Sequence, residues 1–225
     1  MLQWVFFDLG GTLLDDIPFH DHIYREMLDI LARGGYNVNM EEFVEARDLM
    51  VRKRVPMLKA LIRHFTGKQE LVEPMVKELL MRIEGKGPVL QTSFPESDKV
   101  IKTLKGQYKL GVIANQQIDI HNLLKKLGWD KIFEVTVISD EVKLFKPDTR
   151  IFQTALDRAG CSPFCAAMVG DRVDNDIAPA KRIGMKTVRF KAGIFCLQEP
   201  TTEEEKPDCE ILSLSDLQKA LEHIR

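Results

Sequence analysis

The sequence predicts an α/β fold, in which a doubly wound parallel sheet is joined to a small all-helical domain. Short apolar segments alternate with amphipathic segments over residues 90–225, as strands and helices do in a parallel sheet. Residues 15–89 show helical periodicity and no convincing strand. Polar residues directly follow several apolar segments, where open α/β sheets bind ligands. We therefore expect an α/β domain over residues 1–14 and 90–225, and a helical domain over residues 15–89.

The first expected strand is Val5–Phe7, and Asp8 follows it. Its β-branched and aromatic residues favour a buried strand, and Gly10 and Gly11 allow a tight turn and a close approach to a ligand. An ionised aspartate at the end of a buried strand is costly unless a partner compensates it. Asp8 is therefore either a functional group or a residue that forms a turn or caps a helix.

Four helices are expected in the helical domain. Apolar residues at helical spacing define the first, which stops at Gly34. Asn39 is placed to cap the second helix, and Pro56 and Gly67 bound the third. The fourth covers residues 70–83.

The α/β domain resumes after a return linker at residues 85–94. Pro95 is expected to open the next helix, because proline is favoured at the first helical position. The alternation that follows implies right-handed crossovers and helices on both faces of the sheet. The expected strands are 109–114, 135–139, 166–169, 186–190 and an edge strand at 207–212. The expected helices are 95–104, 118–127, 148–159, a segment ending at Ala180, and 215–224 with Ser213 or Ser215 as its cap.

Composition and charge exclude several classes of function. The 225 residues include 32 basic and 34 acidic side chains, and a net charge of −2 does not favour binding to nucleic acid or a membrane surface. No apolar run approaches the ~20 residues of a membrane span, and no secretory signal precedes Asp8. The four cysteines form no C-x-x-C pair, as is typical of thiols in a reducing cytoplasm. We expect a cytoplasmic monomer or homodimer.

Two further carboxylates follow the strand expected at 166–169. Asp171 and Asp176 stand on one loop, where their mutual repulsion makes them poor structural choices without a cation. Together with Asp8 they form an oxygen-rich site suited to Mg²⁺. We expect Asp171 to bind the ion directly and Asp176 to act through a water or from a greater distance. Asp174, on the same loop, is expected to be exposed.

Three motifs occur in one order, each beyond an expected strand: Asp8-Leu9-Gly10-Gly11-Thr12, Lys146-Pro147, and Gly170-Asp171-x4-Asp176. Together they resemble the haloacid dehalogenase-like (HAD) hydrolase superfamily, in the subgroup with a helical cap inserted after the first strand. The resemblance implies a Rossmann-like core and a cap that closes over the active site and selects the substrate. It also implies that Asp8 attacks phosphorus to form an aspartyl-phosphate, and that Lys146, or else Lys143, neutralises the phosphate.

The same resemblance implies further site residues and a cofactor. The cofactor would be Mg²⁺, and the substrate a small phosphorylated molecule. The metal would be bound by Asp8, the backbone carbonyl of Gly10, Asp171 and Asp176. The phosphate-binding positions would be Gly11, Thr12, Ala114 and Asn115.

Two positions depart from the family pattern. Gly10 replaces a second aspartate, which protonates the leaving group and then activates water, and such acid–base help is worth about 10²–10⁴ in rate. Ala114 replaces a serine or threonine that donates to the phosphoryl group, and losing one such donor costs about 10²–10³. Gly10 keeps the backbone carbonyl that the family uses for the metal. Substantial but attenuated catalysis is therefore compatible with the sequence.

Three functions are compatible with these residues. The first is Mg²⁺-dependent, phosphatase-type hydrolysis of a small phosphorylated metabolite. The second is a catalytically weak or inactive HAD-fold module that binds or regulates. The third is phosphonatase-like hydrolysis of a carbon–phosphorus bond, with Lys53 or Lys59 activating the leaving group. A basic cluster in the helical domain is either a solvated face or a place that holds an anionic substrate. Its members are Arg47, Arg52, Lys53, Arg54 and Lys59.

Overall fold

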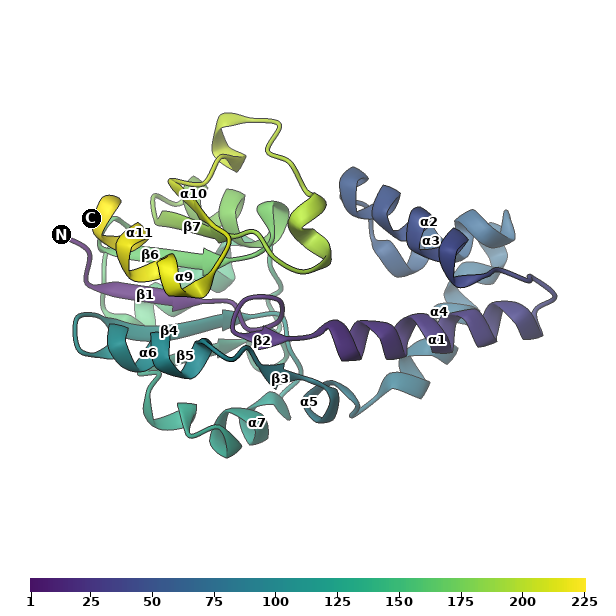
Figure 1. Ribbon diagram of the computed structural model, residues 1–225, viewed down its shortest axis with the longest axis horizontal. Helices are drawn as coiled ribbons and strands as arrows, with labels where there is room; N and C mark the ends of the chain where they lie inside the picture. The colour runs from purple at the N-terminus through teal and green to yellow at the C-terminus, as the bar shows by residue number, and fades with distance from the viewer. The chain divides into compact units, whose positions relative to one another are not determined.

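A computed structural model describes residues 1–225 (Figure 1), and its main feature is a six-stranded sheet. All six strands are parallel, in the order β5-β4-β1-β6-β7-β8. They are β1 (Trp4–Phe7), β4 (Lys109–Ala114), β5 (Val135–Ile138), β6 (Ala166–Gly170), β7 (Lys186–Phe190) and β8 (Cys209–Ile211). The predicted α/β class with a doubly wound parallel sheet is confirmed.

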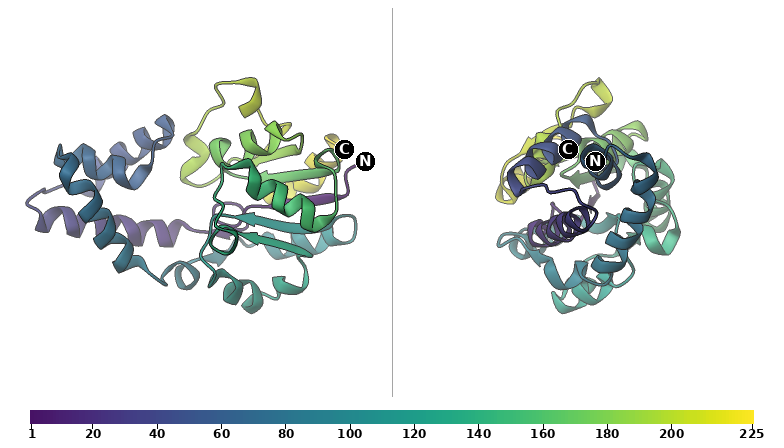
Figure 2. Two further views of the ribbon diagram at one scale, coloured as in Figure 1. Left: turned by 180° about the vertical axis from the view of Figure 1, so that it is seen from behind. Right: turned by 90° about the vertical axis from the view of Figure 1, so that its right-hand side faces the viewer.

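Alternate side chains of β1 enter two separate apolar cores. Val5 and Phe7 lie in the core that α6, α7 and α11 cover, whereas Trp4 and Phe6 lie in the core that α9 and α10 cover. Helices thus flank both faces of the sheet (Figure 2). Phe6 and Phe7 are fully buried, and burying such a side chain stabilises the fold by about 1.5–3 kcal/mol. These helices are α6 (Ser97–Lys105), α7 (Ile120–Lys126), α9 (Thr149–Ala159), α10 (Ala178–Arg182) and α11 (Leu217–His223).

The order of the strands reverses around β1. The chain passes from β1 to β4 on one side and later returns to β6 on the other side. Phe7, the last residue of β1, pairs with Val112 on β4 and with Val169 on β6. The loops that follow these parallel strands therefore emerge together, at the kind of reversal where α/β sheets bind ligands.

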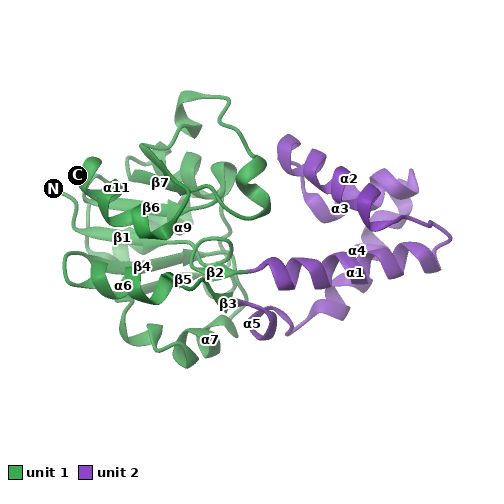
Figure 3. Ribbon diagram, in the orientation of Figure 1, with its two compact units in different colours: residues 1–15, 92–225 green, residues 16–91 purple.

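The chain divides into two compact units (Figure 3): residues 1–15 with 92–225, and residues 16–91. The second unit is helical and encloses an apolar core of its own, in which Met27, Phe43 and Leu61 are fully buried. None of the chain's helices combines the length and apolarity needed to cross a membrane. The helices of the second unit are α1 (Ile17–Arg33), α2 (Met40–Lys53), α3 (Met57–Thr66), α4 (Val72–Ile83) and the short α5 (Gly87–Leu90).

Local capping signals in the helical unit are confirmed. The Asn39 side chain accepts a hydrogen bond from the Glu42 N–H at 2.9 Å, and the Glu42 carboxylate accepts one from the Asn39 N–H at 3.1 Å. This reciprocal pair satisfies two backbone donors at the start of α2. Gly67 ends α3 with a φ of 65°, a conformation that glycine adopts without strain.

Three segments differ from the sequence prediction. The linker at 85–94 contains α5 and β3 (Thr92–Ser93), and β3 pairs with β2 (Leu14–Asp15). Pro95 does not open α6, because the Phe94 N–H still donates to the Leu13 carbonyl at 3.2 Å and keeps the chain in this pairing. A short helix, α8 (Ser139–Val142), also follows β5. The β2–β3 pairing joins segments far apart in the chain, and local patterns do not report it.

Candidate active site

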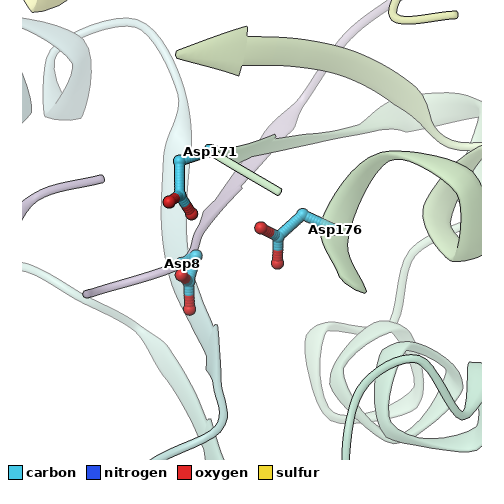
Figure 4. Close-up of side chains that lie close together, drawn as sticks. All are labelled: Asp8, Asp171 and Asp176. Atoms are coloured by element: carbon cyan, nitrogen blue, oxygen red, sulfur yellow. The ribbon is translucent and has the colours of Figure 1, made fainter. Parts of the chain in front are cut away.

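Three carboxylates meet beyond the ends of β1 and β6. Asp8 follows β1, Asp171 and Asp176 follow β6, and their candidate ligand oxygens lie within 4.8 Å of one another. Figure 4 shows the three side chains gathered around a common space. The strand register explains the meeting, since Phe7 pairs with Val169 and the Asp8 N–H donates to the Val169 carbonyl at 2.9 Å. All three carboxylates are buried, so the site needs compensating positive charge.

Lys146 supplies part of that charge. Its Nζ donates to Asp8 Oδ1 at 2.7 Å and to Asp176 Oδ1 at 2.5 Å, and its side chain is 2% exposed. The second bond, to Asp176, is not predicted by the sequence pattern. Lys143, the alternative residue, instead pairs with Asp140 at 2.6 Å on the surface. With three carboxylates and one ammonium, the ionised cluster keeps two negative charges.

The site shifts the proton affinities of its own groups. Burial raises the pKa of Asp8 from an ordinary 3.8 to about 6; the Lys146 ammonium opposes this rise and the Asp176 carboxylate adds to it. Burial alone lowers the pKa of Lys146, but the neighbouring Asp176 and Asp8 outweigh burial and the pKa is raised. Above a pH of about 6 the cluster therefore holds an ionised Asp8 beside a protonated Lys146.

The donor set fits a hard divalent cation. Carboxylate oxygens are the ligands that Mg²⁺ prefers. The candidate ligand oxygens of Asp8, Asp171 and Asp176 lie within 4.8 Å of one another, a spacing at which they could hold one ion together. The two negative charges of the cluster also balance a divalent ion. Gly10 lies in the turn two residues beyond Asp8, where its backbone bridges to Leu14.

Two glycines give the carboxylates room. A Cβ atom on Gly11 would lie 2.5 Å from Asp171 Oδ2, and the φ of Gly11 is +70°, so a side chain here would also strain the backbone. A Cβ atom on Gly170 would lie 2.4 Å from the Cβ of Asp176. Gly11 and Gly170 therefore let Asp171 and Asp176 approach the backbone of the turn after β1 and the end of β6.

Asn115, which follows β4, binds the backbone of Lys146. The Asn115 side chain donates from Nδ2 to the Lys146 carbonyl at 3.0 Å and accepts at Oδ1 from the Lys146 N–H at 2.8 Å. These bonds use Oδ1 and one of the two N–H groups of Nδ2, so the Asn115 side chain fixes the backbone of Lys146, and its contact with a phosphoryl group stays a prediction. Ala114 is fully buried at the end of β4 and offers no hydroxyl. Thr12 is also fully buried, and its Oγ1 has no hydrogen-bond partner.

Two residues of this region, Asp174 and Arg189, go beyond the sequence prediction or differ from it. Asp174 is not exposed: its side chain is 22% accessible, because Arg172 binds it through Nε at 3.0 Å and Nη2 at 2.8 Å. Arg189, the last residue but one of β7, is fully buried and approaches the Asp171 carbonyl with its Nε at 3.4 Å. A charged residue inside the otherwise apolar stretch Val188–Phe190 is the signal that could have identified it.

Two members of the basic cluster form ion pairs within the helical unit. Arg47 binds Asp48 at 2.6 Å, and its guanidinium lies 5.5 Å from the centre of the Tyr24 ring. Lys59 binds Glu73 at 2.6 Å with both side chains about half-exposed or more. An exposed pair such as Lys59–Glu73 is worth little stability, so Lys59 lies on a solvated face, whereas the Arg47 side chain is only 16% exposed.

Comparison with known proteins gives consistent matches. The family model for haloacid dehalogenase-like hydrolases matches residues 2–184. The chain is 39% identical to a Methanopyrus kandleri protein named glyceraldehyde 3-phosphate phosphatase, over 94% of this chain and 93% of that one. It is 30% identical to a protein of the same name from Methanothermobacter thermautotrophicus, over 98% and 100%. The crystal structure of a HAD phosphatase from Thermococcus onnurineus matches over 98% of both chains, with a TM-score of 0.64 and 26% identity.

Proposed function

Because this chain belongs to the haloacid dehalogenase-like hydrolase family, we propose that it hydrolyses a small phosphorylated metabolite through an aspartyl-phosphate on Asp8. One observation carries the proposal: the buried Asp8 carboxylate is bound by the Lys146 ammonium at 2.7 Å beside two further buried carboxylates. An ionised nucleophile next to a fixed cation is suited to receive a negatively charged phosphoryl group. The names of the two curated relatives support the same reaction class.

In the proposed reaction Asp8 is the nucleophile. Lys146 occupies Asp8 Oδ1, so Oδ2 is the oxygen that attacks phosphorus. A new P–O bond forms while the ester P–O bond breaks, and the leaving oxygen takes its proton from solvent because Gly10 has none to give. Water then attacks the phosphorus of the aspartyl-phosphate, and the P–O bond to Asp8 breaks. Inorganic phosphate leaves, the Asp8 carboxylate returns, and the proton lost by the water passes to solvent. Lys146 keeps Asp8 oriented through both steps.

We propose Mg²⁺ as the cofactor, which the side chains of Asp8 and Asp171 and the backbone carbonyl of Gly10 would hold directly and Asp176 through a water or from a greater distance. When bound, it supplies charge that stabilises the phosphoryl oxygens in the transition state. This chain's own contribution is to hold three carboxylates in a buried cluster that Lys146 neutralises only in part. We also propose that Gly11 and Thr12 contact the phosphate, since the Thr12 hydroxyl is unpaired.

The substrate class follows from the relatives and from Gly10. Both curated relatives described above are named for glyceraldehyde 3-phosphate, so three-carbon phosphate esters head the list of candidates. Without an acid at position 10, esters whose leaving groups need little protonation should react fastest. We propose residues 16–91 as the domain that selects the substrate, as the sequence resemblance implies.

The proposal is tested by phosphate release from a panel of sugar, triose and aryl phosphates, with and without Mg²⁺. The wild type should release phosphate only with the metal, and Asp8→Asn should abolish release. Asp140→Asn is the matched control, because Asp140 is a surface carboxylate paired with Lys143. Residual Mg²⁺-dependent turnover in Asp8→Asn would contradict the assignment of the nucleophile.

A second candidate, a binding module with little turnover, is favoured by Gly10 and Ala114. It predicts that the protein binds Mg²⁺ and inorganic phosphate but releases no phosphate from any aryl ester. Carbon–phosphorus hydrolysis has less support, because Lys59 is held by Glu73 as an ion pair and an imine requires a neutral amine. Borohydride trapping of an imine on Lys53 or Lys59 would support carbon–phosphorus hydrolysis.

A further inference from the structure

Arg189 connects the metal-binding loop to a segment further along the chain. Arg189 is fully buried. In the β6–β7 register it pairs with Gly170, which is the residue directly before Asp171. Its Nη2 donates to the Gln198 carbonyl at 2.7 Å and to the Phe195 carbonyl at 3.1 Å. Its Nε approaches the Asp171 carbonyl at 3.4 Å. The Arg189 guanidinium thus links the backbone of Asp171, a candidate metal ligand, to residues 195–198, most of which lie in a short 3-10 helix.

A second, independent link joins the same two segments. Gln198 is 1% exposed, and its Oε1 accepts a hydrogen bond from the Val173 N–H at 3.0 Å. In addition, the Arg172 guanidinium lies 4.2 Å from the centre of the Phe195 ring, a stacked cation–π contact. The turn between Asp171 and Asp176 and the segment 195–198 are therefore joined by side chains from both: Arg172 from the turn and Gln198 from the segment.

The burial of Arg189 needs a reason other than stability. Its carboxylate partner, Glu210, sits at 3.2 Å on the edge strand β8 and is 37% exposed, whereas the Arg189 side chain is fully buried. Replacing a buried ion pair with apolar residues is often neutral or stabilising, so a buried charge is weak evidence of a stabilising role. The Arg189 guanidinium instead carries several N–H donors in one plane, so it can bind several backbone carbonyls at once.

We infer that Arg189 and Gln198 are positioning residues for the metal site, and we call this pair the Arg189–Gln198 buttress. The buttress holds the backbone at Asp171 and Val173, so that the Asp171 and Asp176 carboxylates reach the cation together. The inference rests on the proposed function only in taking these carboxylates as metal ligands. Outer partners that orient metal ligands typically contribute about 10–100-fold to metal affinity.

The test measures Mg²⁺ binding to the metal-free protein by calorimetry, without any substrate. Arg189→Met and Gln198→Leu should each weaken Mg²⁺ affinity by about 10-fold or more. Arg158→Met is the matched control, because Arg158 also donates to a backbone carbonyl, at 2.9 Å from Thr136, but lies on the exposed face of α9. The control should bind Mg²⁺ like the wild type.

A kinetic measurement distinguishes a role in positioning the metal ligands from a general loss of active structure. The variants of the buttress should need about 10-fold more Mg²⁺ for half-maximal phosphate release but approach wild-type turnover at saturating Mg²⁺. If Arg189→Met does not fold, Gln198→Leu decides the question. Wild-type Mg²⁺ affinity in a folded Gln198→Leu variant overturns the inference. Absence of phosphate release in all proteins would refute the proposed function alone, since the calorimetric comparison is unaffected.

Discussion

Replacing Asp8 with asparagine should stabilise the metal-free protein at neutral pH, although it removes the nucleophile. Burial raises the pKa of Asp8 from 3.8 to about 6, because the ionised carboxylate loses its water and faces Asp176. A protonated Asp8 therefore suits the folded site better than an ionised one. The stability that Asp8 contributes is full below a pH of about 4 and is lost as the pH rises through about 6.

The size of the effect follows from the two pKa values. They differ by about 2, and each pKa unit corresponds to about 1.4 kcal/mol, so Asp8→Asn should gain up to about 3 kcal/mol above pH 7. For a chain of this size that is a rise of roughly 6–12 °C in Tm. Lys146 keeps its bond to Asp176 in the variant, so its buried ammonium is not left unpaired.

The assay is thermal denaturation of both proteins in EDTA at several pH values between 4 and 8. The variant should be more stable at pH 8, and the difference should shrink toward pH 4. Asp140→Asn is the control, because Lys143 holds the pKa of the exposed Asp140 below its ordinary value and its loss should bring no gain. Equal stability of wild type and Asp8→Asn at pH 8, or a gain that does not depend on pH, would refute the reasoning.

Three further substitutions test the proposed chemistry. Gly10→Asp should raise phosphate release by up to about 10²-fold by restoring a proton donor, and an unchanged rate would count against the account of the missing acid. Lys146→Met should destabilise the metal-free protein by about 3–5 kcal/mol in urea unfolding, because Asp8 and Asp176 lose their cation. Asn115→Ala should lower turnover about 10-fold by loosening Lys146, whereas Asn122→Ala, at an exposed position of α7, should leave turnover unchanged.

Much of the secondary structure is encoded locally. The strand predicted at 109–114 is found as Lys109–Ala114, and Asn39 and Gly67 bound helices as predicted. These signals work because caps, glycine turns and hydrophobic periodicity depend on residues within a few positions of one another. Pro95 fails as a helix start because a backbone bond to Leu13, made from Phe94, takes precedence over the local preference.

The sequence by itself determined the fold class and pointed to Asp8, Asp171 and Asp176, which follow apolar strands, whereas the resemblance to the HAD family added Lys146 to the candidate site. Only the tertiary structure decided how they interact. Lys146 bonds to both Asp8 and Asp176, and residues 146 and 8 are 138 positions apart in the chain. Such contacts depend on strand register and on the order of strands in the sheet, which no local pattern of residues specifies.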